Sequence, residues 1–375
     1  MTQNKSDNIK PTSYIKSLPV RDRISISQPL GLDTINLGYN ELPFKPTKKI
    51  ALAIEKIKQN AGSYGDPMCF DLRSKIEDVY DIKKEKVICG NGSEELIDVI
   101  ARNFVSSDDE ILISEFGYIQ FVLAANRLNA KLVKASEKLF CTDVDQILGK
   151  VSSKTKLIFM ANPNNPTGTF IELGEIRRLI ENIPTNVALV LDLAYGEFVS
   201  FDYCRQIHTL VDQYENVIVT RTFSKAFGLA GLRVGWCHAP TEMISGFYAA
   251  RGMGSVNAMA QAAAIASLDD IEEIQSRVNL IIDERERVAR ALLEIGVHTL
   301  PSRANFLLAS TNNQDAQSIE GLVQFLFNEA GIIVNRTRET GLEGFMRFSL
   351  SFPENNDLLI KTCSRYLAEG LSKGK

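Results

Sequence analysis

Short apolar segments that alternate with helical segments constrain the fold of this chain most strongly. We expect buried strands at 86–89, 109–114, 131–133, 156–160, 187–191 and 217–219, and another at 235–238. We expect a helix at 93–105 after the first strand, and another helix after the second strand that ends at about residue 128. Strands that alternate with helices predict an α/β fold with a mostly parallel central sheet flanked by helices.

The last third of the chain has a different pattern, which predicts a second, smaller domain. A long charged helix is expected at 271–295, followed by a helix at 316–330, strands at 332–334 and 344–349, and a final helix at 357–371. Residues 1–35 are polar and interrupted by prolines, so they are expected to form an extended arm. We therefore expect an arm at 1–35 that belongs to the small domain, a large domain at 36–275 and a small α+β domain at 276–375.

Composition narrows the class of protein. The 375 residues are 45% apolar and 23% charged, with a formal net charge of -4, and nothing in this balance indicates a nucleic-acid partner. No apolar run approaches the roughly 20 residues that span a bilayer, and the polar start does not resemble a signal peptide. The six cysteines and three histidines show no CxxC pair or metal-ligand spacing. We expect a cytoplasmic protein with reduced thiols and no metal, acting on small molecules.

Lys225 lies in the segment that indicates chemistry most directly, residues 222–235. A lysine held in a dry pocket loses its charge more easily, and the neutral amine is a nucleophile that can form a Schiff base with an aldehyde. Ser224 and Arg233 could hold an anionic group nearby, because a hydroxyl donates one hydrogen bond and a guanidinium donates a fork. Taken alone, the segment could equally be a glycine-rich surface loop.

Two further segments have the character of a binding site. In the segment from Gly90 to Glu95 a strand meets a helix through glycines, and such a junction presents free N–H groups to an anion. Ser93 is expected to cap that helix, so an ordinary capped turn would use the same geometry. Asp192 directly follows the apolar strand at 187–191, where a buried carboxylate is costly unless it is paired.

The segment at 222–235 resembles the cofactor-lysine motif of fold-type I pyridoxal-phosphate (PLP) enzymes, specifically the class I/II aminotransferases. The segment from Asn162 to Gly168 matches the Asn-Pro-x-Asn-Pro-Thr-Gly motif of that family. The Asn-Glu-x-Pro string from Asn40 and the Ser-x-Ala-Asn-Phe string that includes Asn305 are similar to histidinol-phosphate aminotransferases. The resemblance runs from about residue 36 to the last helix and implies PLP as cofactor.

This resemblance also implies a role for individual residues. Lys225 would carry PLP and move the substrate proton, Asp192 would bind the ring nitrogen, and Tyr195 and Asn165 would bind the ring oxygen. The remaining implied cofactor contacts are Gly92, Ser93, Glu94, Ser224 and Arg233 around the phosphate and Tyr118 stacked on the ring. Arg347 would bind the substrate carboxylate, and Asn40 and Asn305 would lie near the substrate. Tyr64 would cross a homodimer interface to the partner's cofactor phosphate.

The chain departs from the family pattern at a few positions. Leu193 replaces the glutamate of the Asp-Glu-Ala-Tyr string, which should alter packing rather than chemistry. Val20 stands where the arm has tyrosine, and 252–254 lacks the usual proline and aromatic residue. Asn335 stands where an arginine follows the Gly-Ile-Ile-Val strand, with Arg336 and Arg338 displaced beyond it. These changes leave open whether histidinol phosphate is accepted.

The implied function is a PLP-dependent aminotransferase that moves an amino group between an amino acid, or histidinol phosphate, and a 2-oxo acid. A PLP-dependent decarboxylase of the threonine-phosphate type shares nearly the same motifs and stays open. A non-catalytic PLP-binding regulatory domain is a remote alternative, because the N-terminal arm is short and not basic.

Overall fold

The computed structural model describes residues 34–311, 315–337 and 339–372, with side chains up to residue 370. The expected arm at 1–35, Val20 included, therefore lies almost entirely outside the described residues, as does Arg338. Among the described residues, no helix is long and apolar enough to cross a membrane.

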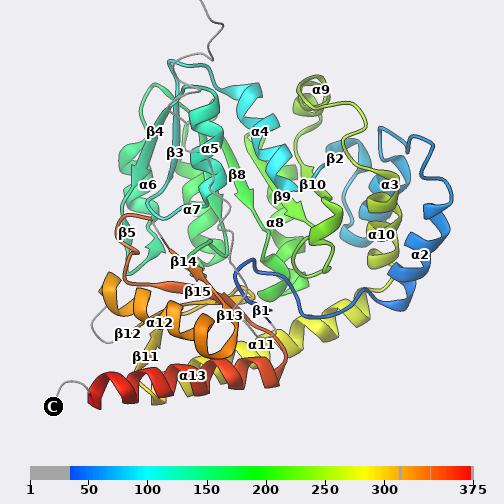
Figure 1. The fold of residues 1–375 in the computed structure, drawn as a ribbon. Helices are drawn as coiled ribbons and strands as arrows, with labels where there is room; N and C mark the ends of the chain where they lie inside the picture. Colours follow the sequence, from blue (N-terminus) through cyan, green and yellow to red (C-terminus); the bar gives the residue numbers. More distant parts are fainter. Residues whose placement is uncertain (1–33, 312–314, 338, 373–375) are drawn as a thin grey trace, which may run out of the picture.

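A seven-stranded sheet forms the larger part of the molecule (Figure 1). Its strand order is β2-β10-β9-β8-β7-β3-β4, and only β10 runs antiparallel to its neighbours. The strands are β2 (Val87–Gly90), β3 (Glu110–Ser114), β4 (Lys131–Ala135), β7 (Thr155–Ala161), β8 (Ala188–Asp192), β9 (Val217–Thr222) and β10 (Gly235–His238). The mostly parallel sheet predicted from the alternation of segments is confirmed.

Helices cover both faces of this sheet because its strands are apolar on both sides. Along β7, Leu157 and Phe159 pack with the helices of one face, whereas Ile158 and Met160 pack with those of the other. The first face carries α4 (Ser93–Phe104), α5 (Ile119–Arg127) and α9 (Thr241–Ala250). The second face carries α6 (Val144–Lys150), α7 (Leu173–Asn182) and α8 (Phe201–Gln213).

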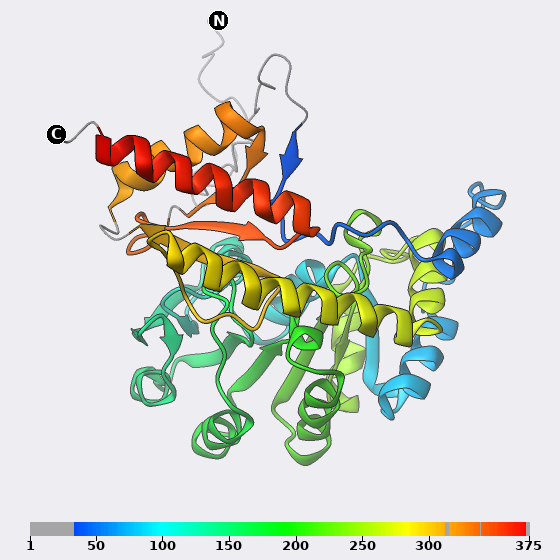
Figure 2. The same ribbon diagram turned by 90° about the horizontal axis from the view of Figure 1, so that it is seen from below.

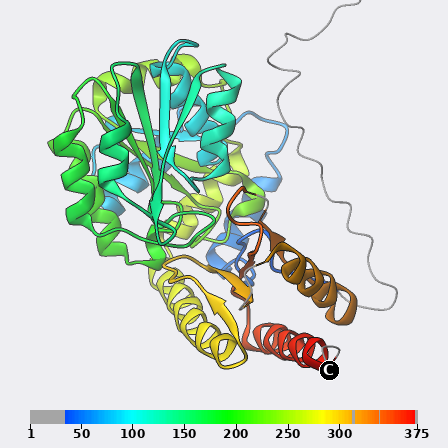
Figure 3. The ribbon, with the colours of Figure 1, turned by 90° about the vertical axis from the view of Figure 1, so that its left-hand side faces the viewer.

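A smaller four-stranded antiparallel sheet, in the order β11-β12-β15-β14, is built from the end of the chain. Its strands are β11 (Val297–Thr299), β12 (Phe306–Thr311), β14 (Asn335–Arg336) and β15 (Met346–Ser349). The accompanying helices are α11 (Ile271–Glu294), α12 (Ala316–Ala330) and α13 (Pro353–Ser372). Figure 2 shows α11 and α13 side by side on one side of the large sheet, and Figure 3 shows α12 and α13 set apart from it.

The remaining elements connect or extend these two parts. Strand β1 (Ile35–Asn36) pairs in parallel with β13 (Ile332–Ile333), so the start of the described chain lies against its C-terminal third. Helix α2 (Lys48–Lys58) packs on α10 (Ala258–Leu268), next to α3 (Phe70–Tyr80). The short elements are η1 (Lys84–Lys86), η2 (Gly196–Phe198), η3 (Ala230–Leu232) and the hairpin of β5 (Glu137–Lys138) and β6 (Cys141–Thr142).

Several expected boundaries differ from those of the structure by a few residues, and three of the differences have a clear structural description. Helix α13 begins at Pro353 instead of residue 357, because proline is well tolerated at the first helical position. The strand expected at 332–334 ends at Ile333, and the chain then pairs with a different strand through β14. Ser93 is not the cap of α4: Gly92 takes that position with φ 80°, and Ser93 is the first helical residue.

Candidate active site

A cavity of about 690 Å³ lies at the carboxyl ends of β7, β8 and β9. It is lined by residues of the large sheet and its loops together with residues around β14 and β15. The lining includes these residues predicted from the sequence: Asn40, Ser93, Glu94, Tyr118, Asn165, Asp192, Tyr195, Ser224, Lys225, Arg233 and Arg347. The ends of parallel strands are where open α/β sheets bind their ligands, so the fold brings the predicted residues to a suitable place.

Lys225 follows β9 and reaches the cavity from a loop. Its Nζ donates to the backbone oxygens of Tyr39 and Asn40, at 3.2 Å each, and lies 5.8 Å from the centre of the Tyr195 ring. Burial, together with the positive charge of Arg347, lowers the pKa of the Lys225 amine to about 8. A substantial share of neutral, nucleophilic amine is therefore present near neutral pH.

Asp192 is the last residue of β8 and is 2% exposed. Its carboxylate accepts a hydrogen bond from the backbone N–H of Ala194 at 3.0 Å. Burial raises the pKa of this carboxyl group to about 6. The site would therefore gain from a cationic group that pairs with Asp192 inside the cavity.

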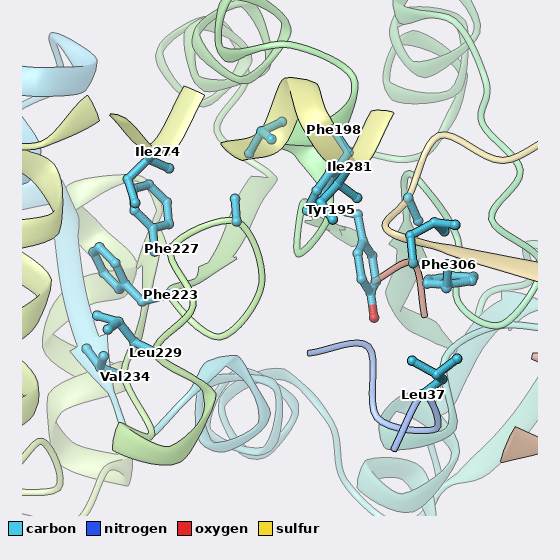
Figure 4. Packing of buried hydrophobic residues seen from close by; sticks show 14 of the residues in the cluster. Leu37, Tyr195, Phe198, Phe223, Phe227, Leu229, Val234, Ile274, Ile281 and Phe306 are labelled. Carbon is cyan, nitrogen blue, oxygen red and sulfur yellow. The ribbon is translucent and has the colours of Figure 1, made fainter. Parts of the chain in front are cut away.

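Tyr195 is held by contacts on its ring and on its hydroxyl group. The ring lies edge-on to Phe306 with centroids 5.1 Å apart, and Figure 4 shows the hydroxyl directed to the segment that carries Leu37. This hydroxyl accepts hydrogen bonds from Asn40 Nδ2 at 2.9 Å and Asn165 Nδ2 at 3.4 Å. Burial raises its pKa to about 12, so the phenol is protonated and available as a donor.

Arg347 comes from β15 and faces the same group of residues. Its Nη1 donates to Asn165 Oδ1 at 2.5 Å and its Nη2 donates to the Gly38 oxygen at 3.0 Å. The guanidinium carbon lies 5.4 Å from the centre of the Phe306 ring. A planar fork held in this way suits a carboxylate or phosphate ligand.

The start of α4 and the loop before β10 form an anion cradle. Arg233 donates to the Ser224 hydroxyl at 3.4 Å, and both residues line the cavity with Ser93. A Cβ at Gly92 would lie 2.5 Å from Arg233 Nη2, and one at Gly235 would lie 2.6 Å from the Ser93 backbone nitrogen. The two glycines therefore allow Arg233 and the helix start to approach each other closely.

Glu94 and Tyr118 line the cavity next to Arg233. The Tyr118 hydroxyl donates to Glu94 Oε1 at 2.7 Å, and Arg233 Nη2 donates to Glu94 Oε2 at 3.4 Å. The Tyr118 ring lines the cavity at the start of α5, where an aromatic face is available for stacking.

Three predicted residues are not part of the cavity lining. Gly92 lies directly behind Arg233, as described above, and Asn305 is fully buried and donates to the Asn40 oxygen at 3.1 Å. Tyr64 is fully exposed and is absent from the cavity lining of this single chain. Its predicted role would require a second subunit.

Sequence reasoning missed Glu339, Thr222 and Tyr39, which also line the cavity. Thr222 was the first residue of the recognised lysine segment, so its position held a usable signal. Tyr39 precedes the Asn-Glu-x-Pro string. Glu339 belongs to no motif and is placed only by the turn that precedes β15.

The features of the cavity can be compared with the chemical groups of PLP. The cavity combines a lysine of lowered pKa, a buried aspartate without an ion-pair partner among the described residues, and an anion cradle that a Cβ at Gly92 would disturb. These three features match the aldehyde, the ring nitrogen and the phosphate of PLP. Fold and site together define a PLP-dependent enzyme of fold type I.

Comparison with known proteins narrows this class. The family model for aminotransferase class I and II matches residues 33–362. A histidinol-phosphate aminotransferase of Rhodopseudomonas palustris strain BisA53 is 32% identical over 92% of this chain and 94% of its own length. The enzyme of the same name from Granulibacter bethesdensis is 35% identical over 89% of this chain and 90% of its own length. The chain belongs to the class I and II aminotransferase family and is a PLP-dependent aminotransferase.

A solved structure supports both the fold and the cofactor. The histidinol-phosphate aminotransferase of Sinorhizobium meliloti in complex with pyridoxal-5'-phosphate superposes with a TM-score of 0.88 at 27% identity. The match covers 98% of this chain and 100% of that chain. The predictions of the fold class, the cofactor and the class of enzyme are thereby confirmed.

Proposed function

We propose that this cavity transfers an amino group between an amino acid and a 2-oxo acid, with Lys225 as the residue that binds PLP and moves the proton. The observation that carries the proposal is that the Lys225 amine and the buried Asp192 carboxylate line the same cavity. When bound, PLP supplies an aldehyde for the amine and a ring that accepts electrons from the substrate α-carbon.

Lys225 is suited to general base and then general acid catalysis. Its pKa of about 8 lies near physiological pH, so the amine can take a proton from the α-carbon and return it. The carbonyl oxygens of Tyr39 and Asn40 accept hydrogen bonds from Nζ and fix its position between these two events.

The other residues in and around the cavity would bind and orient the cofactor and the substrate. Asp192 would keep the ring nitrogen protonated, and the Tyr195 hydroxyl with Asn165 would hold the ring oxygen. Ser93, Ser224 and Arg233 would hold the phosphate, and Gly92 would leave space for Arg233. Tyr118 would stack on the ring. Glu94 would hold Tyr118 and Arg233 in place. Arg347 would bind the substrate carboxylate, and Asn40 and Asn305 would support the substrate side.

We also propose that the enzyme is a cytoplasmic homodimer in which Tyr64 reaches the partner's cofactor phosphate. The support is the full exposure of Tyr64 and the exposure of two apolar side chains, Met253 at 92% and Leu52 at 59%. All six cysteines are free, as a reducing compartment would keep them. The division into a large domain at 36–275 and a small domain of arm plus 276–375 stays a proposal.

The names of the relatives make histidinol phosphate a candidate amino donor. The test is to supply the PLP-loaded enzyme with histidinol phosphate or individual amino acids and to measure both keto product and carbon dioxide. We expect keto product from the wild type, none from Lys225→Ala, and unchanged turnover from Lys361→Ala, an exposed lysine on α13. Carbon dioxide without keto product would instead support the decarboxylase alternative.

A further inference from the structure

The segment from Ser114 to Tyr118 joins β3 to α5 and carries the tyrosine that would stack on the cofactor ring. It makes a tight turn, in which the Gly117 N–H donates to the Ser114 oxygen at 2.9 Å. Asn164, from the loop after β7, donates to the Phe116 oxygen at 3.1 Å. The Ser114 hydroxyl group and the Phe116 N–H then still need partners from another part of the chain.

The hairpin of β5 and β6, none of whose residues lines the cavity, supplies these partners. Glu137 Oε1 accepts a hydrogen bond from the Ser114 hydroxyl and another, at 3.2 Å, from the Phe116 N–H. The Thr142 hydroxyl donates to the Ser114 hydroxyl at 3.3 Å, so both strands of the hairpin hold this residue. Burial raises the pKa of the Glu137 carboxyl group, and its Oε2 is buried without a hydrogen-bond partner among the described residues. A buried carboxyl group is costly, and both hydrogen bonds that Oε1 accepts come from the segment that leads to Tyr118.

The loop of this hairpin adopts a strained conformation. Lys138 and Cys141 pair directly, so Leu139 and Phe140 form a two-residue loop, with φ of 52° and 62°. Such loops usually carry asparagine and glycine, because other side chains are unfavourable at positive φ. The Phe140 ring packs against the Phe116 ring, with centroids 5.8 Å apart. Strain of this kind persists only where surrounding contacts hold it, and here the strained residue supports the same segment.

We propose that Glu137 and Phe140 are positioning residues, which hold the backbone before Tyr118 so that its ring stacks on the ring of PLP. The Tyr118 hydroxyl donates to Glu94, which fixes the far end of the side chain. The hairpin fixes the backbone at the near end, and a ring held at both ends loses little freedom when the cofactor binds. This inference rests on the proposed function, in which Tyr118 is the stacking residue.

The test measures the affinity of the cofactor-free enzyme for PLP by fluorescence titration, and the circular dichroism of bound PLP. We expect Glu137→Ala to weaken binding about tenfold and to reduce the dichroism, because Ser114 and Phe116 lose their acceptor. Glu137→Gln keeps an oxygen that can accept both hydrogen bonds, so its affinity should stay within about twofold of wild type. Phe140→Ala removes the ring contact and should weaken binding by a smaller factor than Glu137→Ala.

A double-mutant cycle separates positioning through Tyr118 from a general loss of stability. Tyr118→Leu should itself weaken PLP binding, and in that background Glu137→Ala should have little further effect. Lys138→Ala changes an exposed residue of the same strand as Glu137. It is the matched control and should bind PLP like the wild type.

Wild-type affinity and dichroism in Glu137→Ala, or a loss that adds fully to that of Tyr118→Leu, would overturn the inference alone. If Glu137→Ala does not fold, Phe140→Ala carries the same test in the same cycle. Unchanged binding in Tyr118→Leu would overturn the stacking role and the inference with it. The absence of keto product from the wild type would instead overturn the proposed function.

Discussion

At the scale of single residues, burial changes the chemistry of Lys225 most. An ordinary lysine has a pKa of 10.5, whereas burial and the charge of Arg347 bring that of Lys225 to about 8. At pH 7 the neutral share therefore rises from well under one in a thousand to about one in ten. This neutral share is what allows the amine to attack an aldehyde.

The rate at which the cofactor-free enzyme binds PLP should therefore rise with pH and level off above about pH 8. Stopped-flow absorbance between pH 6 and pH 10 measures this rate. Arg347→Ala removes a positive charge, so the amine becomes easier to protonate and the profile should move to higher pH. Arg347→Lys keeps the charge and serves as control. A wild-type profile with its midpoint near pH 10.5 would contradict the lowered pKa.

The pKa of Asp192 is raised, whereas that of Lys225 is lowered, and this leads to a prediction about stability. Its folded-state pKa of about 6 lies above the ordinary value of 3.8, so the folded cofactor-free protein loses stability as pH rises between these values. The loss at pH 7 is about 3 kcal/mol, from a shift of about two units. Asp192→Asn should therefore stabilise the cofactor-free protein at pH 7 by up to about this amount, with no gain below about pH 4.

Urea unfolding at both pH values measures the effect of Asp192→Asn. Asp283→Asn, which changes an exposed carboxylate on α11, should have little effect at either pH. A cofactor-free Asp192→Asn protein that is less stable than the wild type at pH 7 would show that a partner already compensates the carboxylate.

At the scale of elements, a buried ion pair connects the two segments that carry the catalytic residues. Arg221 of β9 and Glu197 of η2 pair with each other, and each is 1% exposed. The Arg221 guanidinium also lies over the rings of Tyr80, at 4.9 Å, and Trp236, at 5.5 Å. The pair thus fixes the segment after Tyr195 against the strand that leads to Lys225.

Removal of one partner should be costly because it leaves a buried charge unpaired. We expect Glu197→Leu to lower the free energy of unfolding by about 3–5 kcal/mol, and the double variant Glu197→Leu/Arg221→Met to lose less than the sum of the single variants. Asp98→Ala, which breaks the more exposed pair with Arg127, should cost no more than about 1 kcal/mol. Additive losses in denaturant unfolding would argue against a coupled pair.

The elements also illustrate which features a sequence reveals. The strands of the large sheet were predictable because β7 and β8 are continuous apolar runs. Helix α10 was not predicted, since its small residues Ala260, Ala263 and Ala264 are all buried and give no amphipathic pattern. The candidate site shows the same difference. Lys225 and Asn165 lie in motifs that can be found in the sequence, whereas Glu339 lies in no motif and reaches the cavity only because of the turn before β15.

At the scale of the whole molecule, the exposed Tyr64 makes the proposed dimer testable by complementation. Lys225→Ala has an intact Tyr64 and Tyr64→Phe has an intact Lys225. If each site uses the tyrosine of the other subunit, a mixed dimer contains one complete site. Chains that are unfolded and refolded together should therefore be more active than the sum of the two variants refolded separately. Activity equal to that sum would contradict a shared site.

The position of the cofactor on Lys225 can be measured directly. The PLP-loaded enzyme is reduced with borohydride, which makes the bond between cofactor and protein permanent, and its peptides are analysed by mass spectrometry. We predict the pyridoxyl-phosphate label on the peptide that contains Lys225, and its loss in Lys225→Ala. A label on a different lysine in the active, PLP-loaded enzyme would contradict this account of the site.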